Sequence, residues 1–138
     1  MLPKTHIVLG LVFSILIYFI FHLNLLQVSL IFLASIFIDV DHYLFYLFRK
    51  KDMNLKKAYF WHKGMPKNHK PIAHILHTIE FLTLVMLSAY FWQGFLFILI
   101  GLLFHSIFDI LELMYDERPG TREFFLIRYL ITDKDKYF

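Results

Sequence analysis

The sequence contains no cysteine and few charged residues. The absence of cysteine excludes a disulfide framework, a thiolate nucleophile and any zinc or iron–sulfur site built on sulfur. Only 18% of the 138 residues are charged, whereas 59% are hydrophobic and 20% are aromatic. A soluble domain is nearer about 25% charged, and so many aromatic side chains exclude disorder. The length indicates one domain. Because cysteine is absent, any metal must be bound by His, Asp or Glu.

Four apolar stretches are long enough to cross a bilayer, which requires roughly 17–25 helical residues. They predict an all-α bundle of four transmembrane helices over residues 5–22, 25–49, 71–92 and 94–115. The first stretch is short enough for a signal peptide, but no small-residue cleavage site follows it and the next apolar run begins almost at once. The turns His22-Leu23-Asn24 and Trp92-Gln93-Gly94 would join the helices into two tight hairpins.

The basic residues are sorted along the chain. All 14 Lys and Arg fall at Lys4, between Arg49 and Lys70, or between Arg118 and Lys136, and none lies in the two hairpin turns. By the positive-inside rule, both termini and the loop 49–70 face the cytoplasm of a multi-pass protein of the cell membrane. The net charge of +3 is therefore a sign of topology, and we expect no nucleic-acid partner.

Two segments outside the spans combine basic and apolar residues. The loop 49–70 carries Tyr59, Phe60 and Trp61 among its lysines, which suits a segment lying on anionic lipid headgroups or, equally, a solvated basic linker. The tail 121–138 mixes aromatic and aliphatic residues with charges and predicts an amphipathic helix on the membrane surface.

Ionisable residues recur at one depth in the four spans. Counted from the hairpin turns, His6, Asp39, His77 and Asp109 each lie about 15 or 16 residues along their helix, or about 22 Å at 1.5 Å per residue. This depth is just beneath the cytoplasmic interface of a hydrocarbon core about 30 Å thick. Because ionisable groups inside a membrane are costly, each is a candidate functional residue.

Helical spacing groups these residues into pairs. Asp39 with His42 and His74 with His77 are three residues apart, and His105 with Asp109 are four apart, so each pair shares a helix face. His105, Asp109, Glu112 and Asp116 continue as one stripe. Asp41 would reach the same centre only if its helix is locally distorted.

Facing His and carboxylate side chains in a helical bundle are typical of multi-metal centres. A ligand set without sulfur suits Zn²⁺, Mn²⁺ or Fe²⁺. The alternative is a network of Asp–His hydrogen bonds between helices. For the set as a whole we favour a metal site, with these ligands: Asp39, Asp41, His42, His74, His77, His105 and Asp109.

With these motifs, the chain resembles the membrane-bound metal-dependent hydrolases of the YdjM-like type over nearly its whole length. The resemblance rests on His6, on the stretch Asp39-Val40-Asp41-His42 and on His105-Ser106-Ile107-Phe108-Asp109. Ile38 stands where that family usually has Pro. The family's middle motif fits His69, His74 and His77 in different ways, so all three remain candidate ligands beside His6.

The resemblance implies a function as well as a ligand set. The family is related to the zinc-dependent phospholipase C and P1-nuclease group, which implies two or three zinc ions and hydrolysis of a phosphoester in a phospholipid or lipid-linked compound. Asp39 or Asp41 would bridge metals or orient the attacking water. Lys63, Lys67 and Lys70 would help to hold an anionic headgroup.

Two other classes of function fit the same residues. A metal-ion or proton transporter would keep ionisable groups within the membrane, although the external halves of the four spans carry no charge. A structural membrane protein would use a closed metal site to lock the bundle.

Overall fold

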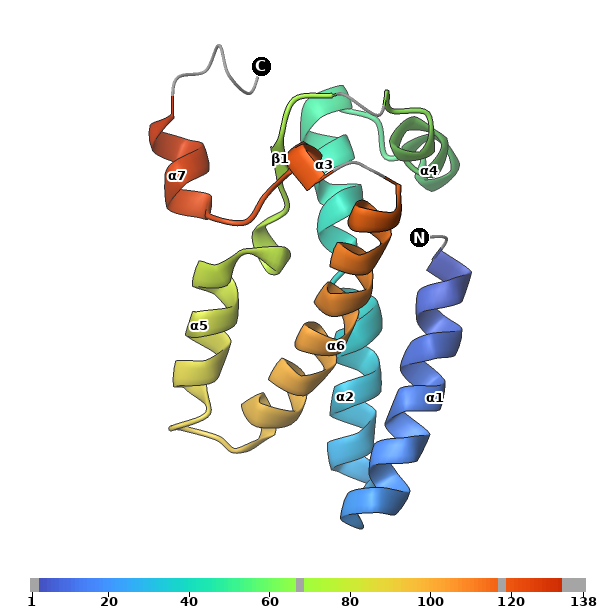
Figure 1. Ribbon diagram of the computed structural model, residues 1–138, viewed down its shortest axis with the longest axis vertical. Coiled ribbons are helices and arrows are strands. Elements are labelled where there is room, and N and C mark those ends of the chain that lie inside the picture. The colour runs from blue at the N-terminus through green and yellow to red at the C-terminus, as the bar shows by residue number, and fades with distance from the viewer. Residues whose placement is uncertain (1–2, 67–68, 117–118, 133–138) are drawn as a thin grey trace.

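The computed structural model describes residues 3–66, 69–116 and 119–132 and shows a mostly helical protein (Figure 1). Its α-helices are α1 (Pro3–Phe21), α2 (Leu25–Phe37), α3 (Val40–Lys50), α4 (Leu55–Lys63), α5 (Ile79–Ser88), α6 (Gly94–Tyr115) and α7 (Leu126–Ile131). Two short strands, β1 (Ile72–Ala73) and β2 (Arg122–Glu123), pair in parallel, and the 3-10 helices η1 (Ile75–His77) and η2 (Pro119–Thr121) adjoin them.

The first hairpin forms where the sequence predicts it. Asn24 caps α2 through a reciprocal pair of hydrogen bonds with Gln27: the Gln27 N–H donates to Asn24 Oδ1 at 3.0 Å, and the Asn24 N–H donates to Gln27 Oε1 at 2.9 Å. His22 adopts a left-handed conformation with φ of 51°. These local features reverse the chain between α1 and α2.

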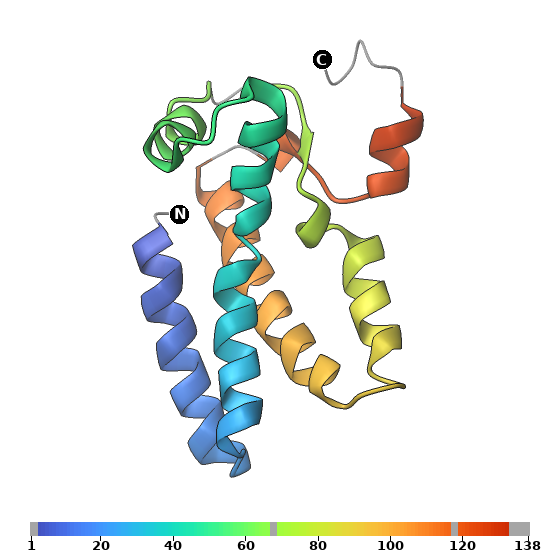
Figure 2. The same ribbon diagram turned by 180° about the vertical axis from the view of Figure 1, so that it is seen from behind.

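Helix α6 packs closely against α2, and α1 and α5 flank this pair on opposite sides (Figures 1 and 2). Gly101 makes the close approach possible, because a Cβ at this position would collide with the backbone carbonyl oxygen of Ile31. His105 lies one turn further along α6. The packing at Gly101 therefore sets the position of a candidate ligand.

The helix that begins at Leu25 is broken at Ile38 and Asp39. This is the local distortion expected from the sequence if Asp41 is to join the other candidate ligands. The Asp39 N–H donates to the Ile36 carbonyl and the His42 N–H to the Asp39 carbonyl, so the helix tightens from four-residue to three-residue hydrogen bonds. No proline is needed for this distortion. It turns the side chain of Asp41 into the interior, where Asp41 is buried.

The third predicted helix is shorter than residues 71–92. Residues 72–77 form β1 and η1 instead, and α5 begins at Ile79 after the N-cap Thr78. Tertiary hydrogen bonds replace helical ones here: β1 pairs with β2, and the Leu76 N–H donates to Asp41 Oδ2 at 2.9 Å. The short-range pattern of the sequence does not reveal these distant partners.

The tail also differs from the predicted helix over 121–138. Residues 122–123 form β2, and the described helical part is α7; residues 133–138 lie outside the described residues. The carboxylate of Glu80 accepts the N–H groups of Leu126 and Ile127 at 2.9 and 3.0 Å, and the Ile79 N–H donates to the Phe124 carbonyl. The tail is therefore fastened to the start of α5.

Replacing Glu80 with Gln tests this attachment. Only one amide oxygen remains to accept the two N–H groups, so we expect amide hydrogen exchange at Leu126 and Ile127 to become roughly tenfold faster. Exchange in α6 should stay unchanged and serves as the internal control. Unaltered exchange at both tail amides would contradict the role assigned to Glu80.

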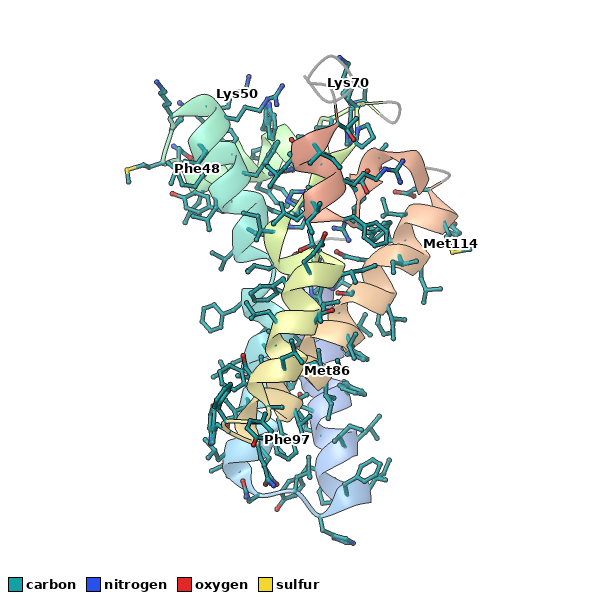
Figure 3. The ribbon with its side chains drawn as sticks, turned by 90° about the vertical axis from the view of Figure 1, so that its left-hand side faces the viewer. Phe48, Lys50, Lys70, Met86, Phe97 and Met114 are labelled. Carbon is teal, nitrogen blue, oxygen red and sulfur yellow. The ribbon has the colours of Figure 1, made fainter. Side chains whose placement is uncertain are left out.

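The surface of the molecule is strongly apolar. Among the described residues, more polar than apolar side chains are buried, whereas Phe19, Leu25 and Phe91 are 67%, 79% and 86% exposed. Two helical stretches are long and apolar enough to cross a membrane: Leu25–Lys50, with a mean hydropathy of 1.7, and Gly94–Tyr115, with 2.2. The apolar parts of α1 and α5 are shorter. Lys50 and Lys70 lie at the end of the molecule opposite Phe97 (Figure 3).

Candidate metal centre

Separate elements bring eight of the predicted ligands together near the end of the bundle where the N-terminus lies (Figure 1). His6 comes from α1, and His105 and Asp109 come from α6. The break between α2 and α3 supplies three more residues, and the β1–η1 segment supplies two. Six of the eight are buried, and Asp39 and His42 are partly exposed. Asp39, Asp41 and His42 are the three residues from the break and the start of α3, and His74 and His77 are the two from the β1–η1 segment.

The first ligand group contains Asp39, His77, His105 and Asp109. His105 Nε2 lies 3.3 Å from Asp39 Oδ1 and 3.5 Å from Asp109 Oδ2, and His77 Nε2 lies 3.4 Å from Asp109 Oδ2. In a tetrahedral site with bonds of about 2.1 Å, neighbouring ligand atoms are about 3.4 Å apart. Three of the distances among the four ligand atoms therefore match a tetrahedral metal shell, and all four atoms lie within 4.8 Å of one another.

The second group contains Asp41, His42 and His74. Asp41 Oδ1 lies 3.1 Å from His42 Nδ1 and 3.8 Å from His74 Nδ1. The rings of His42 and His74 stack with their centroids 3.8 Å apart, and both Nδ1 atoms lie within 3.8 Å of the same oxygen. This group offers two imidazoles and one carboxylate.

A third group shares Asp109 with the first and adds His6 and Glu112. His6 Nε2 lies 3.2 Å from Asp109 Oδ1, and the His6 ring stacks on that of His105 at 4.1 Å. Asp109 thus uses one oxygen toward each group. A carboxylate in this position could bridge two neighbouring ions.

Five of the candidate ligand atoms are buried and make no hydrogen bond of suitable geometry among the described residues, although they lie 3.1–3.8 Å from one another or from a carboxylate oxygen of Asp39 or Asp109. They are Asp41 Oδ1, His42 Nδ1, His74 Nδ1, His77 Nε2 and His105 Nε2. Buried polar atoms are rarely left unsatisfied, because each loses its hydrogen bonds to water. Their grouping around two positions fits the requirement of a metal ion for converging lone pairs.

The opposite ring nitrogens of two histidines have acceptors that fix their protonation. His105 Nδ1 donates to the Ser35 carbonyl at 2.7 Å, and His77 Nδ1 donates to Asp41 Oδ2 at 3.1 Å. Each Nε2 is then free to act as a ligand, as is usual for metal-binding histidines supported by a carbonyl or carboxylate. Asp41 consequently serves both groups: it offers a ligand atom to the second and orients a candidate ligand of the first.

The structure places His69 apart from these groups. Its Nδ1 donates to the Lys70 carbonyl at 2.7 Å, and within the described residues no ligand group includes it. His62, which is not among the ligands expected from the sequence, lies closer: its Nε2 donates to the His42 carbonyl at 2.8 Å. Burial lowers the pKa of His62, so the neutral ring suits this role.

A cavity of about 640 Å³ adjoins the ligand groups. Its wall includes His6, Asp39, His42, His74 and Asp109 on one side and residues of α4, among them Tyr59 and Lys63, on another. Of the three predicted headgroup-binding lysines, Lys63 borders this cavity, Lys70 borders a neighbouring one, and Lys67 lies outside the described residues.

Sequence reasoning did not find Arg122 as part of the site. Arg122 lines the same cavity, and its Nη2 donates to Asp109 Oδ2 at 2.8 Å. Strand β2 carries Arg122 to this place by pairing with β1, and a two-residue parallel pair leaves no detectable sequence signal. Glu112, by contrast, lies on the predicted stripe with His105 and Asp109.

Helix α4 replaces the linker that the sequence allowed within residues 49–70. The Asn54 side chain caps it by accepting the Lys57 N–H at 3.1 Å, and Ala58 is buried on the face toward α3. The hydrogen bond from Lys57 lowers the pKa of the partly exposed Asp52 just before the helix. This short helix covers one side of the cavity.

Comparison of the chain with protein-family models, with curated proteins and with solved structures finds no match. The class of the protein therefore comes from its geometry. It is a mostly helical protein with buried His and Asp groups that could hold metal ions.

Proposed function

We propose that the protein is a membrane-embedded, metal-dependent hydrolase that cleaves a phosphoester of a phospholipid or lipid-linked compound at the cytoplasmic interface. The observation that carries this proposal is that the ligand groups form part of a cavity wall. Structural metal sites are closed by protein ligands, whereas catalytic sites keep a position open to water and substrate. The second and third groups, with three candidate ligands each, leave such a position, whereas the four residues of the first group would fill a tetrahedral shell. Zinc is the metal that best suits the imidazole and carboxylate set, and Mn²⁺ and Fe²⁺ fit the same donors.

The membrane placement is supported by the distribution of side chains. The apolar exterior along α1, α2, α5 and α6 suits lipid, and among the described residues more polar than apolar side chains are buried. We propose that α1 and α5 cross the membrane beside the two longer stretches, with α5 extended by the segment before it. The described lysines and the cavity then lie at the cytoplasmic end, where Lys50 and Lys70 are found (Figure 3).

In the proposed chemistry, the metal ions activate water and offset charge, and the side chains position ligands and accept a proton. Bound divalent ions would lower the pKa of a coordinated water and offset charge on a phosphoryl group. Asp41 is engaged by His77 and the Leu76 N–H, so it serves to position ligands. Asp39 is 31% exposed at the cavity wall, where its carboxylate can accept a proton from the attacking water.

The resemblance to the YdjM-like hydrolases agrees with this proposal. Its most specific element, Asp39-Val40-Asp41-His42, supplies ligands to two adjacent groups because the helix breaks within it. The late His105 and Asp109 complete the first group. The part of the resemblance that involved His69 has no counterpart in the ligand geometry.

Replacing His105 with Ala tests the proposed function. We expect purified wild-type protein to carry at least two divalent ions per chain and to hydrolyse a phosphodiester probe, tested as bis(4-nitrophenyl) phosphate and as phosphatidylglycerol in vesicles. His105→Ala removes a ligand and should lower hydrolysis by at least about a hundredfold. Elemental analysis and product release are the measurements.

His22→Asn is the matched control, because His22 is exposed in the far hairpin turn and Asn tolerates its left-handed conformation. A metal-free wild-type protein, with hydrolysis equal in both variants, would contradict the proposal and leave the cluster as an Asp–His hydrogen-bond network. Metal-dependent flux into liposomes without hydrolysis would instead indicate a transporter.

A further inference from the structure

The guanidinium of Arg122 is held beside the ligand groups by the fold itself. Its side chain is only 10% exposed, and its Nη2 lies 2.8 Å from Asp109 Oδ2 and 3.5 Å from His42 Nε2. Both contacts use one terminal nitrogen, whereas a guanidinium carries five N–H donors in a planar fork. The same side chain lines the cavity.

The segment around Arg122 is fixed from both sides. Thr121 and Glu123 are buried, and β2 pairs with β1, which leads directly into His74 and His77. Glu80 holds the backbone just after it. Ordering a long cation in this way reduces the entropy that it would lose on binding a ligand.

The charges around the cavity explain why a cation is placed there. Its wall carries carboxylates from Asp39, Asp109, Glu112 and Asp116. These would repel an anionic substrate unless cations offset them. Lys63 borders the cavity as an exposed side chain, whereas Arg122 is anchored next to the ligand groups.

We infer that Arg122 is the anion-binding residue of the cavity and holds a non-bridging oxygen of a tetrahedral phosphate group beside the metal positions. This inference rests on the proposed function and narrows the substrate to compounds with a charged phosphoryl group. Arginine suits the role because its fork matches two oxygens of one phosphate. Asp109 keeps the guanidinium in place while its other donors face the substrate.

Binding of inorganic phosphate to zinc-loaded protein in detergent, measured by titration calorimetry, tests the inference. We expect Arg122→Gln to weaken phosphate binding roughly ten- to a hundredfold, because a charge-assisted hydrogen bond is lost. Arg122→Lys keeps the charge without the fork and should give an intermediate loss. Arg128→Gln is the matched control, since Arg128 is 59% exposed on α7 and pairs with Glu123.

The zinc content of each variant separates binding from structure. Equal zinc content with weakened phosphate binding supports the inference. Phosphate binding that is unchanged in Arg122→Gln, or that falls only in proportion to lost zinc, overturns it. If the wild type binds phosphate through Arg122 yet hydrolyses no phosphoester, the proposed function fails while the anion site stands.

Discussion

Replacing Asp41 with Asn is expected to remove metal from the second ligand group and to weaken binding in the first. Asp41 Oδ1 faces His42 and His74, while Oδ2 accepts the Leu76 N–H and His77 Nδ1–H. An amide cannot serve both sides. If the amide oxygen accepts the Leu76 N–H and the His77 Nδ1–H, the NH₂ group faces His42 and His74 and blocks the metal position. If the amide is flipped, its NH₂ group faces the Leu76 and His77 N–H groups, and two donors are placed against each other.

The expected magnitude follows from the two roles. Loss of the direct ligand should abolish binding in the second group. Loss of the partner that orients His77 should weaken the first group roughly ten- to a hundredfold. Elemental analysis combined with competitive chelator titration measures both effects. Asp52→Asn is the matched control, because Asp52 pairs with Lys57 outside the centre. Wild-type metal content in Asp41→Asn would refute the dual role.

Replacing Gly101 with Ala is the second change for which we expect a large effect. The added methyl group would collide with the Ile31 carbonyl and with the Ala34 side chain, so α6 and α2 must separate. Overpacking of this kind costs about 1–3 kcal/mol. His105 lies one turn further along, so its contacts to Ser35 and Asp39 should be disturbed as well.

Thermal unfolding in detergent and zinc affinity are the two measurements for Gly101→Ala. We expect a lower midpoint together with weaker zinc binding. Gly120→Ala is the matched control, because no atom of the described residues lies within 4 Å of a Cβ placed there and its φ is not positive. Equal midpoints for the two variants would show that α2 and α6 do not depend on this close approach.

The sequence predicts the helical parts of this site well because their information is local. The spacing of His105 and Asp109, and the equal depth of residues from several helices, follow from helix geometry alone. Asp41 could join the other candidate ligands only if its helix is distorted, and the sequence left that distortion open. The break at Ile38 and Asp39 provides it. The ligand groups therefore contain residues that pattern analysis could identify.

The parts that sequence reasoning missed depend on contacts between distant segments. Residues 71–78 have an apolar helical pattern, yet they form β1 and η1 because Asp41 and β2 bind their backbone. Arg122 enters the site through that same pairing. His69 was a candidate by motif spacing, and nothing in its local sequence shows that its ring turns to the Lys70 carbonyl.

The pairing of β1 with β2 also bears on the order in which the protein is made. Strand β2 follows every candidate ligand in the sequence, so the ribosome releases it after α1, α2, α5 and α6 have been synthesised. The loop that carries His74 and His77 lacks its strand partner until this late stage. The candidate ligand groups can therefore reach the observed arrangement only once β2 has been made.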